Sequence, residues 1–117
     1  CIDACPTSAI VEPYVVDGSK CIAYATIEIP ADHPIPDHLQ ANMDHWIFGC
    51  DICQDVCPWN RFAKQSIVDS FAPIEILRKE VPDFQQLNEE DFAYNFGQTA
   101  LNRPGLKGLR RNQIIKP

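Results

Sequence analysis

Several features that define common classes of protein are missing from this 117-residue sequence. No apolar run approaches the roughly 20 residues that a membrane-spanning helix needs. Glycine occurs only five times, and no phosphate-binding glycine loop, nucleotide fingerprint or Ser-His-Asp arrangement is recognisable. The sequence begins without the basic and apolar segments of a secretory signal. We therefore expect a cytoplasmic protein with no membrane partner.

Proline and cysteine are frequent by comparison, with ten and six residues. Because proline interrupts regular elements, we expect short helices and strands. Six cysteines amount to about 5% of the chain, below the roughly 8–10% of a disulfide-built secreted scaffold. Without an export signal, they indicate metal or redox chemistry. The predicted fold class is mainly α with short strands, organised around the cysteines.

Local patterns predict where the short elements lie. Asn88 followed by three acidic residues is a strong helix start, because its side chain caps the helix and the acids favour the positive end of the dipole. Similar arguments from caps, prolines and apolar spacing cover the rest of the chain. They predict an extended stretch at 14–16, a turn at 17–18, two helical turns within 21–29, a connector over 30–36, and helices over 37–48, 74–79, 89–96 and 106–115.

Two cysteine segments end in the same way. One reads Cys1-x-x-x-Cys5-Pro6, and the other reads Cys50-x-x-Cys53-x-x-x-Cys57-Pro58. The bacterial signature for a four-iron, four-sulfur cluster is C-x2-C-x2-C-x3-C-P, and its fourth cysteine binds the other cluster in two-cluster ferredoxins. Both segments match the closing half of that signature. Their spacing predicts two clusters that exchange one ligand each.

The second segment lacks the first cysteine of the signature, because Ile47 occupies that position. Cys21, which has no other assignment, can replace it from a distance. The predicted ligands of one cluster are then Cys5, Cys21, Cys50 and Cys53. The other cluster takes Cys1 and Cys57, and its two remaining cysteines belong upstream of Cys1. We therefore expect the chain to be a fragment with one complete ligand set and half of a second.

Other uses of the cysteines remain open at this point. A zinc ion bound by Cys50 and Cys53 with two further thiolates is one alternative. Structural disulfides are another, and Cys1 with Cys57 is the pair that a truncated, air-exposed chain would oxidise. A thioredoxin-like role for Cys50-x-x-Cys53 is weaker, because no βαβ pattern surrounds it.

The sequence resembles the epoxyqueuosine reductase family in these same segments. The resemblance is carried by the opening CIDACPTSAI (1–10), by CIAYATIE (21–28), by GCDICQDVCPWNR (49–61), by Phe92, Phe96 and Arg103, and by LRRN (109–112). Many ferredoxins share the cysteine-proline ending, whereas isolated Cys21 together with the tail Pro58-Trp59-Asn60 is far more specific.

Members of that family are cobalamin-dependent enzymes that reduce the epoxide of epoxyqueuosine in tRNA and carry two four-iron, four-sulfur clusters. The resemblance implies a ferredoxin-like two-cluster domain over 1–65 and a helical extension over 66–117. It also implies that the cobalamin-binding domain and the catalytic acid precede this chain. The chain alone would then relay electrons from a reduced flavodoxin- or ferredoxin-type donor without being catalytic.

Two other functions remain as alternatives. One is the iron-sulfur domain of a reductive dehalogenase-like enzyme or another cobalamin reductase. The other is a non-catalytic module whose cluster is structural.

Charge is distributed unevenly along the chain. Residues 1–102 carry a net charge of −11, whereas residues 103–117 carry +5 with no acid. A basic end attracts phosphate. The residues predicted to contact tRNA are Arg103, Lys107, Arg110 and Arg111.

Four aromatic residues bracket the second cysteine segment. We expect them to form an apolar coat that keeps water from the cluster. These residues are Trp46, Phe48, Trp59 and Phe62.

Overall fold

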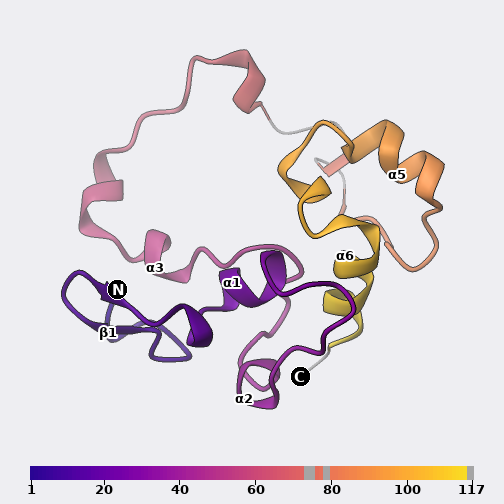
Figure 1. The fold of residues 1–117 in the computed structure, drawn as a ribbon. Helices are drawn as coiled ribbons and strands as arrows, with labels where there is room; N and C mark the ends of the chain where they lie inside the picture. Colours follow the sequence, from indigo (N-terminus) through magenta and orange to yellow (C-terminus); the bar gives the residue numbers. More distant parts are fainter. Residues whose placement is uncertain (73–75, 78–79, 116–117) are drawn as a thin grey trace.

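The computed structural model describes residues 1–72, 76–77 and 80–115, and this part of the chain is mainly helical with one small sheet. The helix predicted over 74–79 lies largely outside the described residues. Within them, no helix has the length and hydropathy to cross a membrane. The elements are β1 (Ile10–Glu12), β2 (Val15–Val16), α1 (Ile22–Ile27), α2 (Asp37–Gln40), α3 (Ile52–Asp55), α5 (Glu89–Phe96) and α6 (Gly105–Ile114) (Figure 1).

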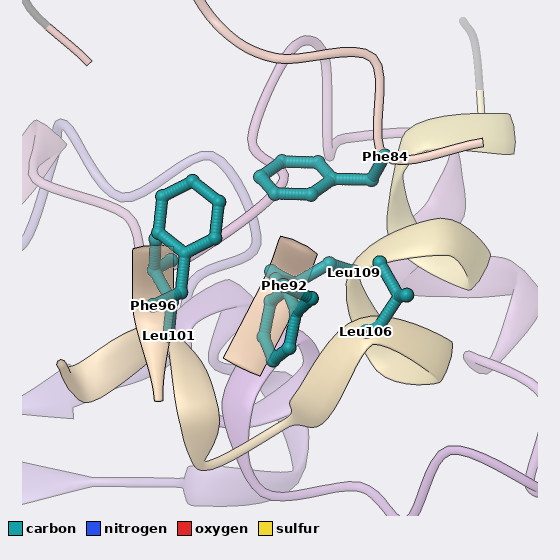
Figure 2. Packing of buried hydrophobic residues seen from close by; sticks show 6 residues of the cluster. All are labelled: Phe84, Phe92, Phe96, Leu101, Leu106 and Leu109. Atoms are coloured by element: carbon teal, nitrogen blue, oxygen red, sulfur yellow. The ribbon is translucent and has the colours of Figure 1, made fainter. Parts of the chain in front are cut away.

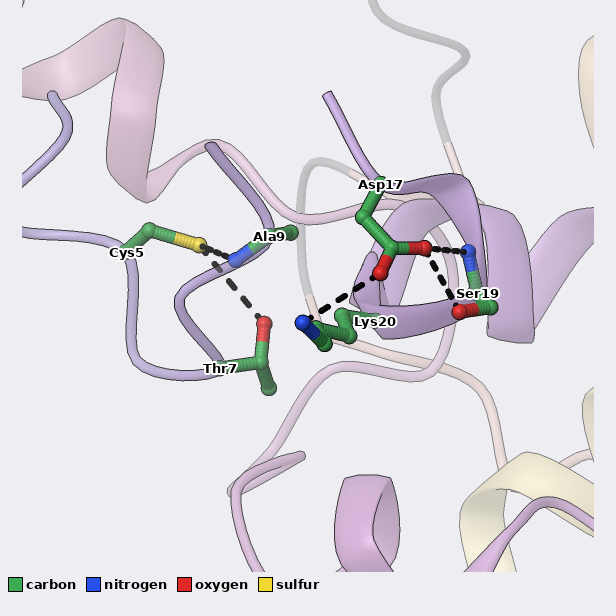
Figure 3. A network of polar contacts seen from close by, with 6 residues as sticks. All are labelled: Cys5, Thr7, Ala9, Asp17, Ser19 and Lys20. Carbon is green, nitrogen blue, oxygen red and sulfur yellow. Dashed lines mark hydrogen bonds and ion pairs between the residues drawn. The ribbon is translucent and has the colours of Figure 1, made fainter. Parts of the chain in front are cut away.

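The two strands form an antiparallel hairpin that leads directly into α1. Ile10 pairs with Val16, so the predicted extended stretch over 14–16 is confirmed for Val15 and Val16. It is wrong for Tyr14, which lies in the turn with a positive φ of 69°. The predicted turn after the hairpin is a 3₁₀ turn over Gly18–Lys20. Asp17 caps this turn by accepting the Ser19 amide at 3.0 Å (Figure 3). The chain then enters α1 with Cys21 at its N-cap.

Two apolar clusters form the core. One joins α1 to the connector and α2, and its buried members are Ile22, Ala25, Ile35, Leu39 and Met43. The other joins α5 to α6, and its buried members are Phe84, Phe92, Phe96, Leu101, Leu106 and Leu109 (Figure 2). Ile115, which follows α6, packs on the first cluster.

The prediction of one helix over 37–48 is wrong, because α2 ends at Gln40. The Asn42 side chain donates to the His38 carbonyl at 3.2 Å, and Asp44 has a positive φ of 46°. Asparagine and aspartate bond readily to nearby backbone and tolerate this left-handed conformation, so they end helices. The turn that results buries Met43 as a member of the first apolar cluster.

The helices predicted over 89–96 and 106–115 are confirmed, the second with a shift of one residue. Asn88 caps α5 by accepting the Asp91 amide at 2.8 Å.

We expect Asn88→Ala to lower the free energy of unfolding by about 1 kcal/mol, because one amide at the helix start loses its partner. Urea unfolding measures this loss. Asn88→Ser keeps an acceptor and is the matched control, so equal losses in both variants would contradict a capping role.

Candidate metal centre

Four thiols from three separate segments line one cavity of about 110 Å³. They belong to Cys5, Cys21, Cys50 and Cys53. Most of the remaining wall is apolar and comes from Pro6, Ala9, Ile10, Val16, Ile22 and Ile52. The volume far exceeds what a single water molecule needs. Thiolates bind iron and other soft metals, and an apolar wall controls the access of water to them.

Cys5 is fixed by the turn at the start of the chain. Its amide donates to the Cys1 carbonyl at 3.1 Å, and its Sγ accepts the Ala9 amide at 3.2 Å and lies 3.6 Å from the Thr7 hydroxyl (Figure 3). Burial acts to raise the pKa of this thiol, but the hydrogen bonds from Thr7 and the neighbouring amides outweigh it and lower the pKa. The turn therefore favours the thiolate form that binds metal.

The other three thiols are placed by two helix starts. Cys21 is the N-cap of α1, and Cys53 lies in the single turn of α3, which begins after Asp51. Burial raises the pKa of the Cys50 thiol, and negative charge on Cys53, Cys21 and Cys5 raises it further. Negative charge on these three neighbours therefore disfavours the thiolate form of Cys50, and a bound cation would relieve that repulsion.

The remaining two predicted ligands do not line this cavity. Cys1 is exposed, and Cys57 is half-buried at the start of the 3₁₀ turn over Pro58–Phe62. All six cysteines are unpaired thiols. In the part of the chain that the structure describes, no three His, Cys, Asp or Glu side chains are grouped closely enough to bind a single metal ion.

The basic residues at the end of the chain make internal contacts. Arg103 forms a two-point ion pair with Glu28 at 2.7 and 2.8 Å. Arg110 donates to the carbonyls of Phe84 and Leu87 at 3.0 and 2.6 Å. Arg111 faces backbone carbonyls near the end of α1, and burial lowers its pKa. Lys107 is exposed. The contact of all four with tRNA stays a prediction.

The expected aromatic coat is wrong, because none of its four members is among the residues that line the cavity. Trp59 and Phe62 are 84% and 82% exposed, because the 3₁₀ turn that carries them lies away from the core. Trp46 and Phe48 instead pack on the two apolar clusters. The wall of the cavity comes mostly from small and branched apolar residues of the hairpin, α1 and α3.

Sequence analysis missed two buried polar residues near the site. Thr26 in α1 is fully buried, and Asn112 in α6 is only 2% exposed. Asn112 follows Leu106 and Leu109 at helical spacing, so it lies on the buried face of α6. A polar residue on an otherwise apolar helix face is the signal that could have identified it.

A small helical fold with cysteine thiols gathered around a shielded cavity is that of a domain that binds a metal cluster. Comparison with protein families narrows this class. The family described as the 4Fe-4S double cluster binding domain matches residues 1–60, and the chain belongs to that family.

The chain is also similar to longer curated proteins that carry the name epoxyqueuosine reductase. The epoxyqueuosine reductase of Leadbetterella byssophila is 52% identical over 112 residues, and that of Escherichia coli is 41% identical over 112 residues. These matches cover 96% and 94% of this chain but only 36% and 29% of the two relatives. The chain therefore spans about a third of the length of the curated relatives that it matches.

Solved structures show the same likeness. A crystal structure of epoxyqueuosine reductase with a tRNA-Tyr epoxyqueuosine-modified tRNA stem loop has a TM-score of 0.86 at 28% identity, over 98% of this chain and 30% of that one. The epoxyqueuosine reductase of Streptococcus thermophilus has a TM-score of 0.73 at 31% identity, with the same two coverages.

Proposed function

We propose that this chain is the iron-sulfur part of an epoxyqueuosine reductase and relays electrons to the reducing site of that enzyme. The observation that carries the proposal is the apolar cavity lined by four thiols. A four-iron, four-sulfur cluster takes four cysteine ligands and, when bound, accepts and releases single electrons. The donor set and the shielded wall fit such a cluster.

In this proposal the chain has a ferredoxin-like arrangement with two clusters. Cys5 belongs to the first cysteine segment but lines a cavity with thiols of the second, which supports the exchange of ligands between clusters. Cys1 and Cys57 would bind the second cluster together with two cysteines from outside this chain. The division into a cluster domain over 1–65 and an extension over 66–117 stays a prediction, and α6 packs on α1 across that boundary.

The partners of the whole enzyme are part of the proposal. The names of the relatives support an epoxyqueuosine-containing tRNA as substrate. We expect cobalamin to bind a domain outside this chain, a reduced flavodoxin- or ferredoxin-type protein to donate electrons, and the enzyme to act in the cytoplasm. Here the chain's own residues hold the cluster, keep water away from it and carry no catalytic group.

The zinc alternative is less well supported. The family model that matches residues 1–60 describes a 4Fe-4S double cluster domain rather than a zinc site. The alternative of a reductive dehalogenase-like enzyme is disfavoured by the names of the curated relatives and of the similar structures.

A segment exchange tests the proposed function. Residues 1–117 replace the matching segment of the Leadbetterella byssophila relative in a bacterium that lacks its own epoxyqueuosine reductase. We expect queuosine to reappear in the tRNA, because the exchanged segment supplies the electron path. Mass spectrometry of tRNA nucleosides measures the ratio of queuosine to epoxyqueuosine. The control is the same chimaera with Cys50→Ser, and queuosine formation that survives this substitution would contradict the relay.

A further inference from the structure

A buried polar network joins α1, the segment before Cys50, and α6. The Asn112 side chain donates through Nδ2 to the carbonyls of Thr26 and Ile47, each at 2.8 Å. The Thr26 hydroxyl accepts the Gly49 amide at 3.0 Å and donates to a carbonyl one turn earlier in α1 at 2.9 Å. Both side chains are buried, so these bonds do not compete with water.

The network connects two of the segments that carry the cavity thiols. Thr26 lies on the helix that Cys21 caps, and Gly49 immediately precedes Cys50. The bond from the Gly49 amide to Thr26 therefore fixes the approach to Cys50 against the helix of Cys21. Asn112 reinforces the same junction from α6, because it bonds to both segments at once.

Arg111 holds the Asn112 amide in the orientation that this junction needs. Its Nε and Nη2 donate to Asn112 Oδ1 at 3.1 and 3.0 Å, which leaves Nδ2 free to donate to the two carbonyls. The same guanidinium also donates to four carbonyls at the end of α1 and just after it, those of Ala25, Ile29, Pro30 and His33.

We propose that Asn112 and Thr26 are positioning residues that set the placement of Cys21 relative to Cys50 and so determine how firmly the cage holds its cluster. This inference rests on the proposed function, since it assumes that the four thiols bind an iron-sulfur cluster. Residues that do not bind the metal themselves but hold its ligands in place tune both the affinity and the electronic properties of the metal site. All four cavity thiols lie within residues 1–60 and Asn112 lies outside them, so the helical extension would support the cage from beyond the segment that the family match covers.

The same helix provides a matched control. Gln113, the next residue of α6, accepts the Phe84 amide at 2.8 Å and donates to the Pro82 carbonyl at 3.1 Å. It ties α6 to a segment that carries no cavity thiol. Removing Gln113 thus breaks two hydrogen bonds of α6, where removing Asn112 breaks four, and it does so without touching the cage.

The test compares four single variants of the chain after anaerobic reconstitution with iron and sulfide. Asn112→Ala and Gln113→Ala form one pair, and Thr26→Val and Thr26→Ser form the other. Valine matches the shape of threonine but lacks the hydroxyl, whereas serine keeps the hydroxyl and loses only a methyl group. Cluster release into an iron chelator and the electron paramagnetic resonance spectrum of the reduced cluster are measured for each variant. Circular dichroism verifies that each variant is folded.

We expect Asn112→Ala and Thr26→Val to release the cluster about 10-fold faster and to change the resonance spectrum, because the cage loses its support. In Gln113→Ala and Thr26→Ser, the rate of cluster release and the resonance spectrum should stay close to those of the unsubstituted chain. Equal effects within each pair would overturn the positioning role. An unsubstituted chain that assembles no cluster would overturn the proposed function as well, so the two failures are distinguishable.

Discussion

Replacing Cys21 by serine is expected to abolish the cluster in the four-thiol cavity. Cys21 is isolated in the sequence, yet its side chain lines the cavity with thiols from both cysteine segments. A serine hydroxyl is a far poorer ligand for iron than a thiolate. We expect the iron content of the chain to fall from about four per molecule to less than one, with loss of the visible charge-transfer absorption.

The control for this prediction is Cys57→Ser. Cys57 does not line the cavity, so the same iron content and absorption should persist in this variant. Both variants are reconstituted anaerobically and assayed for iron and acid-labile sulfide. A Cys21→Ser chain with its full complement of iron would refute the predicted ligand set, because the cluster would then be held by other residues.

Replacing Phe96 by alanine is expected to cause the largest loss of stability among substitutions in the core. Phe96 is fully buried, and its ring centroid lies 6.0 Å from that of Phe84 and 5.5 Å from that of Phe92 (Figure 2). Deleting a buried aromatic ring removes its apolar contacts and leaves a cavity, which costs about 3–5 kcal/mol. Such a loss is a large part of the stability of a small domain.

Urea unfolding of the Phe96→Ala chain measures this loss. The control is Tyr94→Ala on the same helix, since Tyr94 is 90% exposed and its removal should change the free energy of unfolding very little. The aromatic cluster lies between α5 and α6, so the destabilisation is expected even in the chain without iron. Similar free energies for the two variants would contradict the described core.

Local chemistry made much of this fold predictable from the sequence. The cap at Asn88 and the acids after it identified α5, and the apolar spacing after Cys21 identified α1. The helix over 37–48 failed because two polar side chains, those of Asn42 and Asp44, favour turns over a continued helix. Helix ends are decided by such local competition, which an apolar pattern does not register.

The grouping of Cys5, Cys50 and Cys53 was predicted from the spacing of a cluster signature, whereas Cys21 was added because it had no other assignment. The network behind the cavity was not predicted, because its bonds join residues far apart in the chain. Asn112 and Thr26 are 86 positions apart, and nothing in the sequence near either residue indicates the other. The exposure of Trp59 could not be predicted from the sequence either, since it depends on where the 3₁₀ turn that carries it lies relative to the core.

At the basic end of the chain, the sequence reveals the charges but not the contacts that the side chains make. Charge alone predicts that Arg110 and Arg111 contact phosphate, whereas the structure shows both guanidinium groups bound to backbone carbonyls. Arg103 and Lys107 are both exposed, but the Arg103 guanidinium is paired with Glu28. If tRNA contact involves this end, Lys107 is the residue that we expect to contribute most to its salt dependence.

The central claim is that four thiols enclose one iron-sulfur cluster, and metal analysis of the anaerobically reconstituted chain tests it most directly. The account predicts about four irons and four sulfides per chain in a cluster that accepts one electron on chemical reduction and then gives a resonance signal. A folded chain that instead binds one zinc ion, or that retains less than one iron with its thiols idle, would contradict it.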